Sequence, residues 1–518
     1  WRGEVCGRQD PRSRMAQLID SPHAEMKRIL DVQKKAFIAN GAPSTQERIR
    51  RIDVAIKLLL DNADALCAAV DEDFGGRPVK FTKFVDVATV VDGLKNARAH
   101  VAKWSAPHRR GVEFPMNLAG ASNAVEYVPK GVVGVISPWN YPVSLLFNPL
   151  AGIFAAGNSA MLKPSEFVPK TAELVRKLVA EAYDESVCCV VTGHADVAAT
   201  FSSLPFDHLM YTGSTRVGKI VARAAAENLV PCTLELGGKC PVIVGASTDL
   251  NVTAMRLAHG KVMNAGQTCI APDVVFVPAA LKQPFADAFK AAVADMFPAG
   301  VAQSGDYTSV ISDAHYERAT GLVAEAEAAG VEVLVCPGGD AAATGGDEES
   351  KAGAYPRRMA PTLVFDPADD LKISGEEIFG PPMVVRTYDA VEDAVAYVNA
   401  RPRPLACYYF GTDAAEEAKV LPRITAGGVC VNDVIMHVAQ EDLPFGGVGG
   451  SGYGSYHGHE GFLEFSHHKG VHRQVATGRQ FLLQGIYPPY DKKGSMLDMI
   501  IDMKLTPAKD SKLPCCIL

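Results

Sequence analysis

The chain has 518 residues, of which 48% are hydrophobic and 21% charged, and its formal net charge is −8. This length predicts two or more packed domains, because a single hydrophobic core stops growing beyond roughly 250–300 residues. The negative charge argues against nucleic acid as a main partner, and no apolar run reaches the roughly 18 residues that a membrane-spanning helix needs.

The first 14 residues have no hydrophobic periodicity and contain four arginines, two acidic residues, a proline and two glycines. We expect residues 1–14 to be a leader outside the fold, with Met15 as the natural start of the folded chain. A mitochondrial or chloroplast transit peptide is the alternative, but Glu4 and Asp10 argue against it because such peptides are poor in acidic residues.

Residues 22–104 have the pattern of a helical layer. Met26, Ile29 and Leu30 recur at helical spacing, and Ser44 precedes a segment that starts like a capped helix. The segment carries no group with evident chemistry, so we interpret it as scaffold helices that flank a sheet. The expected helices cover residues 45–61, 63–74 and 81–104.

A β-hairpin is expected over residues 107–129, where the composition changes to Pro, Gly and Asn followed by an alternating run. Strands and helices then alternate, which predicts a doubly wound parallel sheet. The expected strands are 131–138, 160–163, 187–191 and 208–212, and the expected helices are 145–156, 169–182 and 217–226.

Polar residues follow the strands of this sheet. Asn140 comes after the first strand, and Lys163 and Glu166 come at the end of the second. In open α/β sheets ligands bind beyond the carboxyl ends of the strands, so these side chains are candidate ligand contacts. Residues 213–218 turn into a helix and offer backbone N–H groups at its N-terminus, which suits a phosphate; a plain turn is the alternative.

A second α/β region follows residues 233–239 and ends near residue 422. Residues 336–353, rich in Gly, Asp and Glu, are expected to form an exposed loop. The expected strands are 241–244, 274–277, 331–335, 361–365 and 406–410, and the expected helices are 250–264, 282–296, 314–329 and 390–400.

Cys269 lies at a junction between helix and strand, three residues after Gly266, where backbone can approach a ligand closely. A thiolate at such a place is a good nucleophile if its surroundings lower its pKa. The alternative for a single cysteine is a small buried apolar residue. The chain has twelve cysteines without the spacing of a disulfide framework, so we expect reduced thiols and a cytoplasmic protein.

Six short motifs decide between these alternatives, because together and in this order they resemble the aldehyde dehydrogenase superfamily. The resemblance covers residues 15–473, and the short lead-in to Asn140 and the Ala271-Pro272-Asp273 that follows the cysteine look like the class 3 branch, which acts on fatty and aromatic aldehydes. The motifs are Pro138-Trp139-Asn140-Tyr141-Pro142, Lys163-Pro164-Ser165-Glu166, Gly213-Ser214-Thr215-Arg216-Val217-Gly218, Leu234-Glu235-Leu236-Gly237-Gly238-Lys239, Gly266-Gln267-Thr268-Cys269 and Glu377-Ile378-Phe379-Gly380-Pro381.

The resemblance implies two doubly wound α/β domains and a β arm for oligomerisation. The expected NAD(P)-binding domain comprises residues 15–106 and 130–234, and the catalytic domain residues 235–422. The arm comprises residues 107–129 and 423–475, and residues 476–518 form a tail. The resemblance also implies a homodimer.

For catalysis, the resemblance implies that Cys269 attacks an aldehyde to give a thiohemiacetal and then a thioester. The side-chain amide of Asn140 and the backbone N–H of Cys269 would stabilise the oxyanion, and Glu235 would act as general base for hydrolysis. A solvated or capping acid is the alternative for Glu235 considered alone.

The cofactor contacts also come from the resemblance. Lys163 and Glu166 match positions at the adenosine ribose, and Glu377 and Phe379 match positions on the nicotinamide-ribose side. Glu166 would repel a 2′-phosphate and so favours NAD, although the class 3 branch often accepts NADP. Gly213, Ser214 and Gly218 match positions at the pyrophosphate and adenine.

The predicted substrates are medium- or long-chain and aromatic aldehydes. A CoA- or phosphate-dependent relative is one alternative, but such enzymes lack the base that Glu235 provides. A catalytically silent structural protein on the same fold is the other. The residues expected to line an apolar substrate tunnel are Tyr141, Val434, Ile435, Met436 and Phe445.

The tail ends in Cys515-Cys516-Ile517-Leu518, which fits a prenylation signal at Cys515 with a terminal Leu that favours geranylgeranyl. A lipid there, with the lysines upstream, would permit peripheral association with a membrane. A chance pair of cysteines is the alternative. No metal site is expected, because the histidines between residues 457 and 472 fit no zinc pattern.

Overall fold

The computed structural model describes residues 22–114, 116–337, 355–474, 484–490 and 495–506. The chain divides into two compact units. Unit 1 comprises residues 1–104 and 129–466, and unit 2 comprises residues 105–128 and 467–518. The predicted leader and Cys515 lie outside the described residues. None of the helices in the described ranges is long and apolar enough to cross a membrane.

The first sheet of unit 1 has six strands in the order β15-β7-β6-β3-β4-β5, and all pairs except β15·β7 are parallel. This confirms the predicted doubly wound sheet, including β3, whose five residues are all buried. The strands are β3 (Val132–Ile136), β4 (Ser159–Lys163), β5 (Cys188–Val190), β6 (His208–Gly213), β7 (Cys232–Leu236) and β15 (Gly452–Tyr453).

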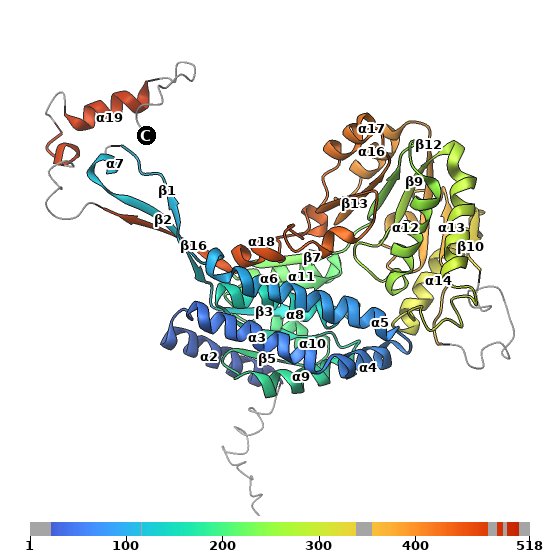
Figure 1. Ribbon diagram of the computed structural model, residues 1–518, viewed down its shortest axis with the longest axis horizontal. Coiled ribbons are helices and arrows are strands. Elements are labelled where there is room, and N and C mark those ends of the chain that lie inside the picture. The colour runs from blue at the N-terminus through green and yellow to red at the C-terminus, as the bar shows by residue number, and fades with distance from the viewer. Residues whose placement is uncertain (1–21, 115, 338–354, 475–483, 491–494, 507–518) are drawn as a thin grey trace, which may run out of the picture. The chain divides into compact units, whose positions relative to one another are not determined.

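Helices cover both faces of this sheet (Figure 1). On one face, residues of α2, α10 and α11 form a core with β3, β6 and β7. On the other face, α8 contacts β3 and β4 and packs against α3, α6 and α18. The helices are α2 (Pro22–Asn40), α3 (Thr45–Asp61), α6 (Thr89–Trp104), α8 (Ser144–Ala156), α9 (Pro169–Ala182), α10 (Ala195–Ser202), α11 (Thr215–Ala226) and α18 (Gly458–Glu464).

The predicted starts and ends of the N-terminal helices hold, with one exception. α3 and α4 (Ala63–Phe74) have the predicted bounds, and the Ser44 hydroxyl caps α3 by accepting a hydrogen bond from the Glu47 N–H (3.2 Å). The helix predicted over 81–104 starts two residues earlier and contains a π-helical turn that was not predicted. The chain is helical from Val79 to Trp104, as α5 (Val79–Thr82), the π-helical turn (Lys83–Ala88), in which Asp86 is buried, and α6.

The second sheet of unit 1 has seven strands in the order β10-β11-β12-β9-β8-β13-β14, with only β10 antiparallel. β12 and β14 were not predicted. The strands are β8 (Pro241–Val244), β9 (Val274–Pro278), β10 (Val333–Val335), β11 (Thr362–Phe365), β12 (Pro382–Tyr388), β13 (Ala406–Phe410) and β14 (Gly428–Val431). The helices are α12 (Leu250–Val262), α13 (Lys282–Met296), α14 (Asp313–Ala328), α15 (Lys372–Gly375), α16 (Val391–Asn399) and α17 (Ala414–Val420).

One domain boundary differs from the prediction. Residues 423–466 were assigned to the arm, but β14 pairs with β13 inside the seven-stranded sheet, and these residues belong to unit 1. Backbone pairing at residues that are far apart in sequence decides this boundary, and no local pattern reports it.

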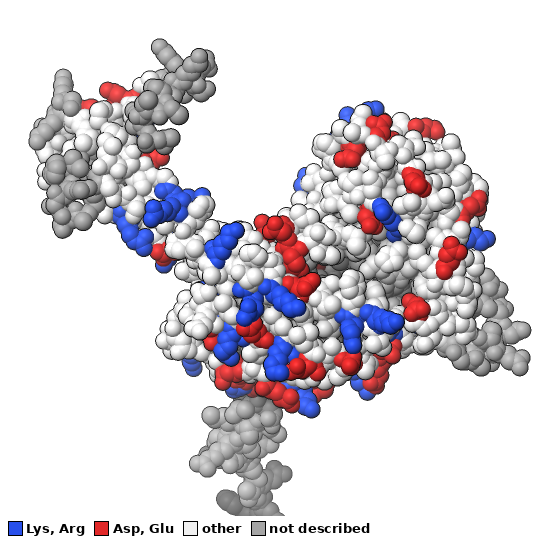
Figure 2. Space-filling model, in the orientation of Figure 1, with Lys and Arg blue, Asp and Glu red and all other residues white. Residues whose placement is uncertain are grey.

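Unit 2 contains the predicted hairpin of β1 (His108–Arg110) and β2 (Ser122–Pro129), and β16 (Ser466–Arg473) adds a third strand beside β2. Lys469 and Arg473 form ion pairs with Glu126 (2.8 and 3.0 Å). Unit 2 also holds the short helices α7 (Met116–Ala119) and α19 (Met496–Leu505). In unit 1, the face shown in Figure 2 carries intermixed acidic and basic side chains.

Candidate active site

A cavity of about 330 Å³ in unit 1 collects most of the catalytic and cofactor residues predicted from the sequence. It lies beyond the carboxyl ends of β3, β6 and β7, where ligands bind in open α/β sheets. Seven predicted residues line it: Asn140, Gly213, Ser214, Glu235, Cys269, Glu377 and Phe379.

The nucleophile loop before Cys269 has an unusual backbone. α12 ends at Val262, two residues before the predicted end, and Asn264, Ala265 and Gly266 follow with φ of 48°, 54° and 70°. Only glycine fits at Gly266, because a Cβ there would lie 2.2 Å from the Gly380 carbonyl oxygen. Strained backbone of this kind concentrates at functional sites, where the surrounding structure holds it in place.

Three hydrogen bonds join the loop after β3, which contains Asn140 and Tyr141, to the nucleophile loop. The Asn140 amide donates to the Gln267 carbonyl (3.0 Å), and the Asn264 amide donates to the Asn140 carbonyl (2.9 Å). The third joins the hydroxyls of Tyr141 and Thr268 (2.6 Å). An amide carries two N–H donors, so Asn140 keeps one donor for a ligand beside Cys269.

The Cys269 thiol is held in its neutral form. Burial raises its pKa to about 12, and the carboxyl groups of Glu377 and Glu235 add to the rise, while the backbone N–H groups of Cys269 and Ile270 oppose it. Nucleophilic attack requires the thiolate, so the proton of this thiol must leave before or during the reaction.

Glu235 lies on β7 and is 2% exposed. Neither of its carboxyl oxygens has a hydrogen-bond partner among the described residues. Burial raises the pKa of Glu235 well above its usual value, and the Glu464 carboxylate adds to this. A buried carboxyl group with a raised pKa and unpartnered oxygens is suited to general acid–base catalysis.

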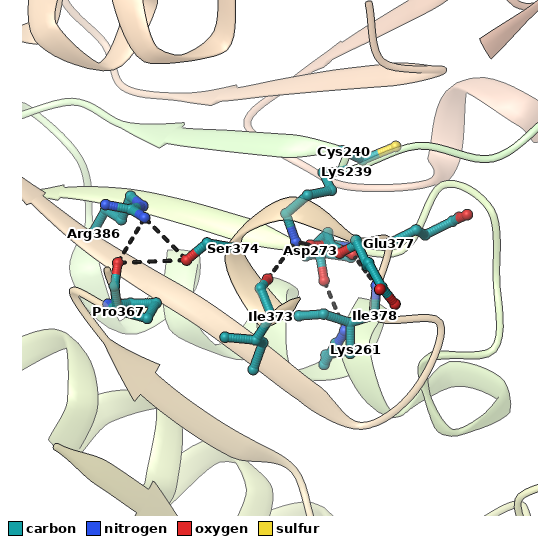
Figure 3. A network of polar contacts seen from close by, with 12 residues as sticks. Lys239, Cys240, Lys261, Asp273, Pro367, Ile373, Ser374, Glu377, Ile378 and Arg386 are labelled. Atoms are coloured by element: carbon teal, nitrogen blue, oxygen red, sulfur yellow. Dashed lines mark hydrogen bonds and ion pairs between the residues drawn. The ribbon is translucent and has the colours of Figure 1, made fainter. Parts of the chain in front are cut away.

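A network of polar contacts fixes the backbone on both sides of Glu377, a residue of the cavity wall (Figure 3). Lys239 forms a buried ion pair with Asp273 and donates to the Ile373 and Glu376 carbonyls (2.8 Å each). Asp273 in turn accepts a hydrogen bond from the Ile378 N–H (2.8 Å). Burial raises the pKa of Glu377 to about 8, with Asp273 adding and the Gly238 N–H opposing.

Three predicted cofactor residues, Lys163, Glu166 and Gly218, do not line this cavity. Lys163 is buried at the end of β4, and its ammonium group donates to the Pro164 carbonyl (3.0 Å) and contacts the Glu166 carboxylate (3.3 Å). Gly218 has a packing role, because a Cβ there would lie 2.5 Å from the Leu236 side chain. Ser214, which does line the cavity, caps α11 by accepting a hydrogen bond from the Val217 N–H (3.4 Å).

The predicted substrate residues also lie outside the lining of this cavity. Val434, Ile435 and Phe445 are buried, whereas Met436 is 36% exposed. Phe445 belongs to a cluster of rings, which we call the aromatic cluster. Its members are Tyr408, His437, Phe445, Tyr456 and His457, with neighbouring ring centroids 4.4–6.1 Å apart.

Three large side chains that line the cavity were not predicted from the sequence: Trp139, His315 and Arg318. Trp139 belongs to the motif that contains Asn140, and its ring makes edge-on contacts with those of His315 (ring centroids 5.0 Å apart) and Phe379 (5.5 Å). Arg318 donates to the carbonyls of Ile378 (2.7 Å) and Glu377 (2.5 Å). His315 and Arg318 come from α14, where no local motif marks them.

Among the described residues, no group of three or more His, Cys, Asp or Glu side chains could hold a metal ion. The groups with evident chemistry that line the cavity are a thiol, two carboxyl groups with raised pKa values, a partly free amide donor, and the side chains of His315 and Arg318.

Comparisons with known proteins agree with this geometry. A family model described as the aldehyde dehydrogenase family matches residues 8–471. A probable coniferyl aldehyde dehydrogenase of Caulobacter vibrioides is 47% identical over 473 residues, which are 91% of this chain and 95% of that protein. A family 3 aldehyde dehydrogenase of Dictyostelium discoideum is 34% identical over 459 residues, covering 88% and 93% of the two chains, as the class 3 resemblance predicted.

A solved structure of a Staphylococcus aureus aldehyde dehydrogenase, described as its substrate-bound state, superposes with a TM-score of 0.83 and 32% identity. The superposition covers 92% of this chain and 99% of that one. The chain therefore belongs to the aldehyde dehydrogenase family.

Proposed function

We propose that this enzyme oxidises aromatic aldehydes to carboxylic acids, with Cys269 as nucleophile and a nicotinamide dinucleotide as hydride acceptor. The observation that carries the proposal is the meeting of Cys269, Glu235 and Asn140 around one cavity, although they are far apart in sequence.

The first step is attack of the Cys269 sulfur on the aldehyde carbon, which forms a C–S bond and leaves a negative oxygen. The free N–H of the Asn140 amide and the backbone N–H of Cys269 are the donors for this oxyanion. Donors fixed in advance at the place where charge develops contribute much of the rate enhancement, and the loss of one costs about 3 kcal/mol of barrier. The three hydrogen bonds between the two loops fix Asn140 in this way.

Glu235 is proposed as the general base that activates water for hydrolysis of the thioester on Cys269. Its two unpartnered carboxyl oxygens are free to accept a proton, and its buried position raises its pKa, which makes it a stronger base than an exposed carboxylate. This role argues against an acyl transfer to CoA or phosphate, since such a reaction needs no activated water.

The residues present fit a nicotinamide dinucleotide, which when bound would accept the hydride of the aldehyde. The carboxyl oxygen Oε1 of Glu377 is buried without a partner among the described residues, and Ser214 places the N-terminus of α11 at the cavity. Lys163 and Glu166 would hold the ribose of the adenosine. Because Glu166 would repel a 2′-phosphate, we propose NAD⁺ as the preferred cofactor over NADP⁺.

The proposed substrates are aromatic aldehydes of the cinnamyl type. The Caulobacter relative that shares 47% of its residues with this chain is described as acting on coniferyl aldehyde. The aromatic cluster supplies flat apolar side chains close to the chemistry, since the Tyr408 hydroxyl donates to the carbonyl of Ile270, next to Cys269 (2.6 Å). Aromatic rings favour offset or edge-on contacts with other rings. Medium- and long-chain aldehydes are the second candidate class.

An aldehyde panel tests the proposal. NADH or NADPH absorbance is followed with coniferaldehyde, cinnamaldehyde, benzaldehyde, decanal and acetaldehyde, each with NAD⁺ and with NADP⁺, and the Cys269→Ala variant is the blank. We expect the highest kcat/KM with a cinnamyl aldehyde and NAD⁺. A highest value with acetaldehyde would refute the substrate class, and an absence of turnover with all five would refute the reaction.

We further propose that the enzyme is a homodimer. Unit 2 forms a small antiparallel sheet of three strands, and β14, the edge strand of the seven-stranded sheet, exposes Val429 (40%) and Val431 (39%). Exposed apolar edge strands favour pairing with another chain. Light scattering coupled to size-exclusion chromatography should give twice the mass of one chain; a monomeric mass would refute the proposal.

A further inference from the structure

A buried ion pair lies beside the active site in unit 1. The guanidinium Nη2 of Arg77 is 2.8 Å from Oδ2 of Asp86, and both side chains are fully buried. Arg77 follows α4, and Asp86 belongs to the π-helical turn Lys83–Ala88. π-Helical turns are rare and occur mostly at functional sites.

Arg77 packs against three aromatic rings. Its guanidinium carbon lies 4.9 Å from the ring centre of Phe74, 5.3 Å from that of Phe81 and 5.1 Å from that of Tyr141. None of the three guanidinium nitrogens of Arg77 makes a hydrogen bond to a described residue, so the contact with Asp86 is an ion pair without hydrogen-bond geometry. The side chain is therefore held by Asp86 and by the rings, and the contact with Tyr141 reaches the motif that contains Asn140.

Asp86 binds the two residues that directly follow the same motif. Its Oδ1 accepts hydrogen bonds from the backbone N–H groups of Ser144 (2.9 Å) and Val143 (3.2 Å), at the N-terminus of α8. A carboxylate is favourable at this end of a helix, because the first N–H groups have no partner within the helix. Asp86 thus fixes where α8 begins, four residues after Asn140.

Two hydrogen bonds connect this motif to the nucleophile loop. The Tyr141 hydroxyl bonds that of Thr268 (2.6 Å), the residue before Cys269, and the Asn140 amide bonds the carbonyl of Gln267 (3.0 Å). A continuous path of contacts therefore runs from the ion pair through Tyr141 to the residue beside the nucleophile.

We propose that Arg77 and Asp86 are positioning residues that set the Asn140 oxyanion donor against the Cys269 sulfur. Neither touches the reacting atoms; Arg77 acts through the Tyr141 ring, and Asp86 acts through the start of α8. A purely stabilising role accounts less well for the pair, because apolar residues often replace a buried ion pair with no loss of stability. The effect on turnover rests on the proposed aldehyde oxidation.

The test compares the double variant Arg77→Met/Asp86→Asn with the wild-type enzyme. The double variant leaves no unpaired buried charge, so we expect it to fold with a Tm near that of the wild type. We expect kcat/KM for the aldehyde and the single-turnover rate of NADH formation to fall roughly 10- to 100-fold, the effect of small misplacements of reacting groups. The KM for NAD⁺ should stay unchanged.

Two further variants separate positioning from stability. Arg77→Lys keeps the charge beside Asp86 but loses the flat guanidinium over Tyr141, so we expect an intermediate rate. The matched control is Arg48→Met. Arg48 is a buried arginine on α3 that donates to the Ala155 carbonyl (3.0 Å), at the opposite end of α8. The Arg48→Met substitution should lower Tm but leave kcat/KM for the aldehyde and the single-turnover rate at wild-type values.

Alkylation of Cys269 by iodoacetamide gives a readout that needs no aldehyde. Followed by peptide mass spectrometry, it should be several-fold faster in the double variant, because the restraint on the nucleophile loop is lost, and unchanged in Arg48→Met. The proposal would be overturned if the folded double variant were alkylated and turned over at wild-type rates. It would also be overturned if the KM for NAD⁺ rose by the same factor by which kcat/KM for the aldehyde fell. A wild-type enzyme inactive on every aldehyde would refute the proposed function, and alkylation would still decide the role of the pair.

Discussion

Gly237 lies directly against the Glu377 carboxylate. A Cβ on Gly237 would be 2.1 Å from Oε2 of Glu377 and 2.4 Å from Oε1. These residues come from the link after β7 and from the loop before β12, and both line the active-site cavity. The absence of a side chain at Gly237 therefore sets where the carboxylate of Glu377 can sit.

Gly237→Ala should displace Glu377 without unfolding the protein. The clashing atoms are the far end of a side chain, so the carboxylate can move while the backbone stays. Because Glu377 is proposed to contact the nicotinamide ribose, we expect a rise in the KM for NAD⁺ and a fall in kcat of roughly 10-fold or more. Steady-state kinetics at saturating aldehyde measures both.

Gly238→Ala is the control for this prediction. A Cβ there would meet its nearest neighbour, the Pro404 Cα, at 3.6 Å, which is ordinary contact. Alanine also keeps the N–H that opposes the raised pKa of Glu377. Kinetic constants near wild type are expected, and equal damage from the two substitutions would contradict the proposed role of the Gly237 contact.

Cys269→Ala should abolish oxidation, by at least about 10³-fold, because the covalent step has no substitute in the cavity. Cys240→Ala is the matched control. Cys240 is buried beside the nucleophile, and its thiol donates to the Cys269 carbonyl (3.3 Å) without lining the cavity. We expect that variant to keep turnover within a few-fold. NADH formation, with Tm as a check on folding, distinguishes the two cysteines.

The sequence predicted most regular elements because their patterns are local. α3, α4, α9, α13 and β8 have the predicted bounds, where capping, proline and β-branched signals coincide. The errors occur where distant contacts decide. The π-helical turn lies where Asp86 binds the N-terminus of α8, and α12 ends early before left-handed backbone at Asn264 and Ala265, which neither residue requires by itself.

The same distinction between local patterns and distant contacts applies to the residues of the candidate site. Cys269, Glu235 and Asn140 were predictable because each lies in a short motif shared with a known family, and the fold brings them to one cavity. Arg318 was not predictable, because it acts by donating hydrogen bonds to backbone carbonyls near Glu377, and a backbone acceptor leaves no trace in the sequence. β15 pairs antiparallel with β7, the strand that carries Glu235. It was not predicted either, because this pairing is also between backbone groups that leave no trace in the sequence.

Asn140→Asp tests the oxyanion donor with little change in volume. The side chain loses its N–H groups, so the negative oxygen would face a carboxyl group instead of a donor. Loss of one such donor lowers kcat roughly 10²- to 10³-fold. The single-turnover rate of NADH formation measures the step directly. A fall below 10-fold would mean that the backbone N–H of Cys269 is sufficient by itself.

Glu377→Gln should make Cys269 more acidic. The Glu377 carboxyl group is the largest electrostatic contribution, after burial, to the raised pKa of the Cys269 thiol, and a neutral amide removes the repulsion between the two negative groups. The pH profile of alkylation by iodoacetamide should therefore shift to lower pH. A profile that stays in place, or moves to higher pH, would show that burial alone sets the acidity of the thiol.

Glu235→Gln should stabilise the enzyme at high pH while it lowers turnover. Burial raises the pKa of Glu235 above its value in the unfolded chain, so the native state binds more protons and stability falls as pH rises above the unfolded value and through the folded value. Glutamine cannot ionise and avoids this loss. The Tm difference between variant and wild type should therefore be larger at pH 9 than at pH 6. If Tm differed equally at the two pH values, the Glu235 carboxyl group would be ionised in the native enzyme throughout, and its proposed readiness to hold a proton would be refuted.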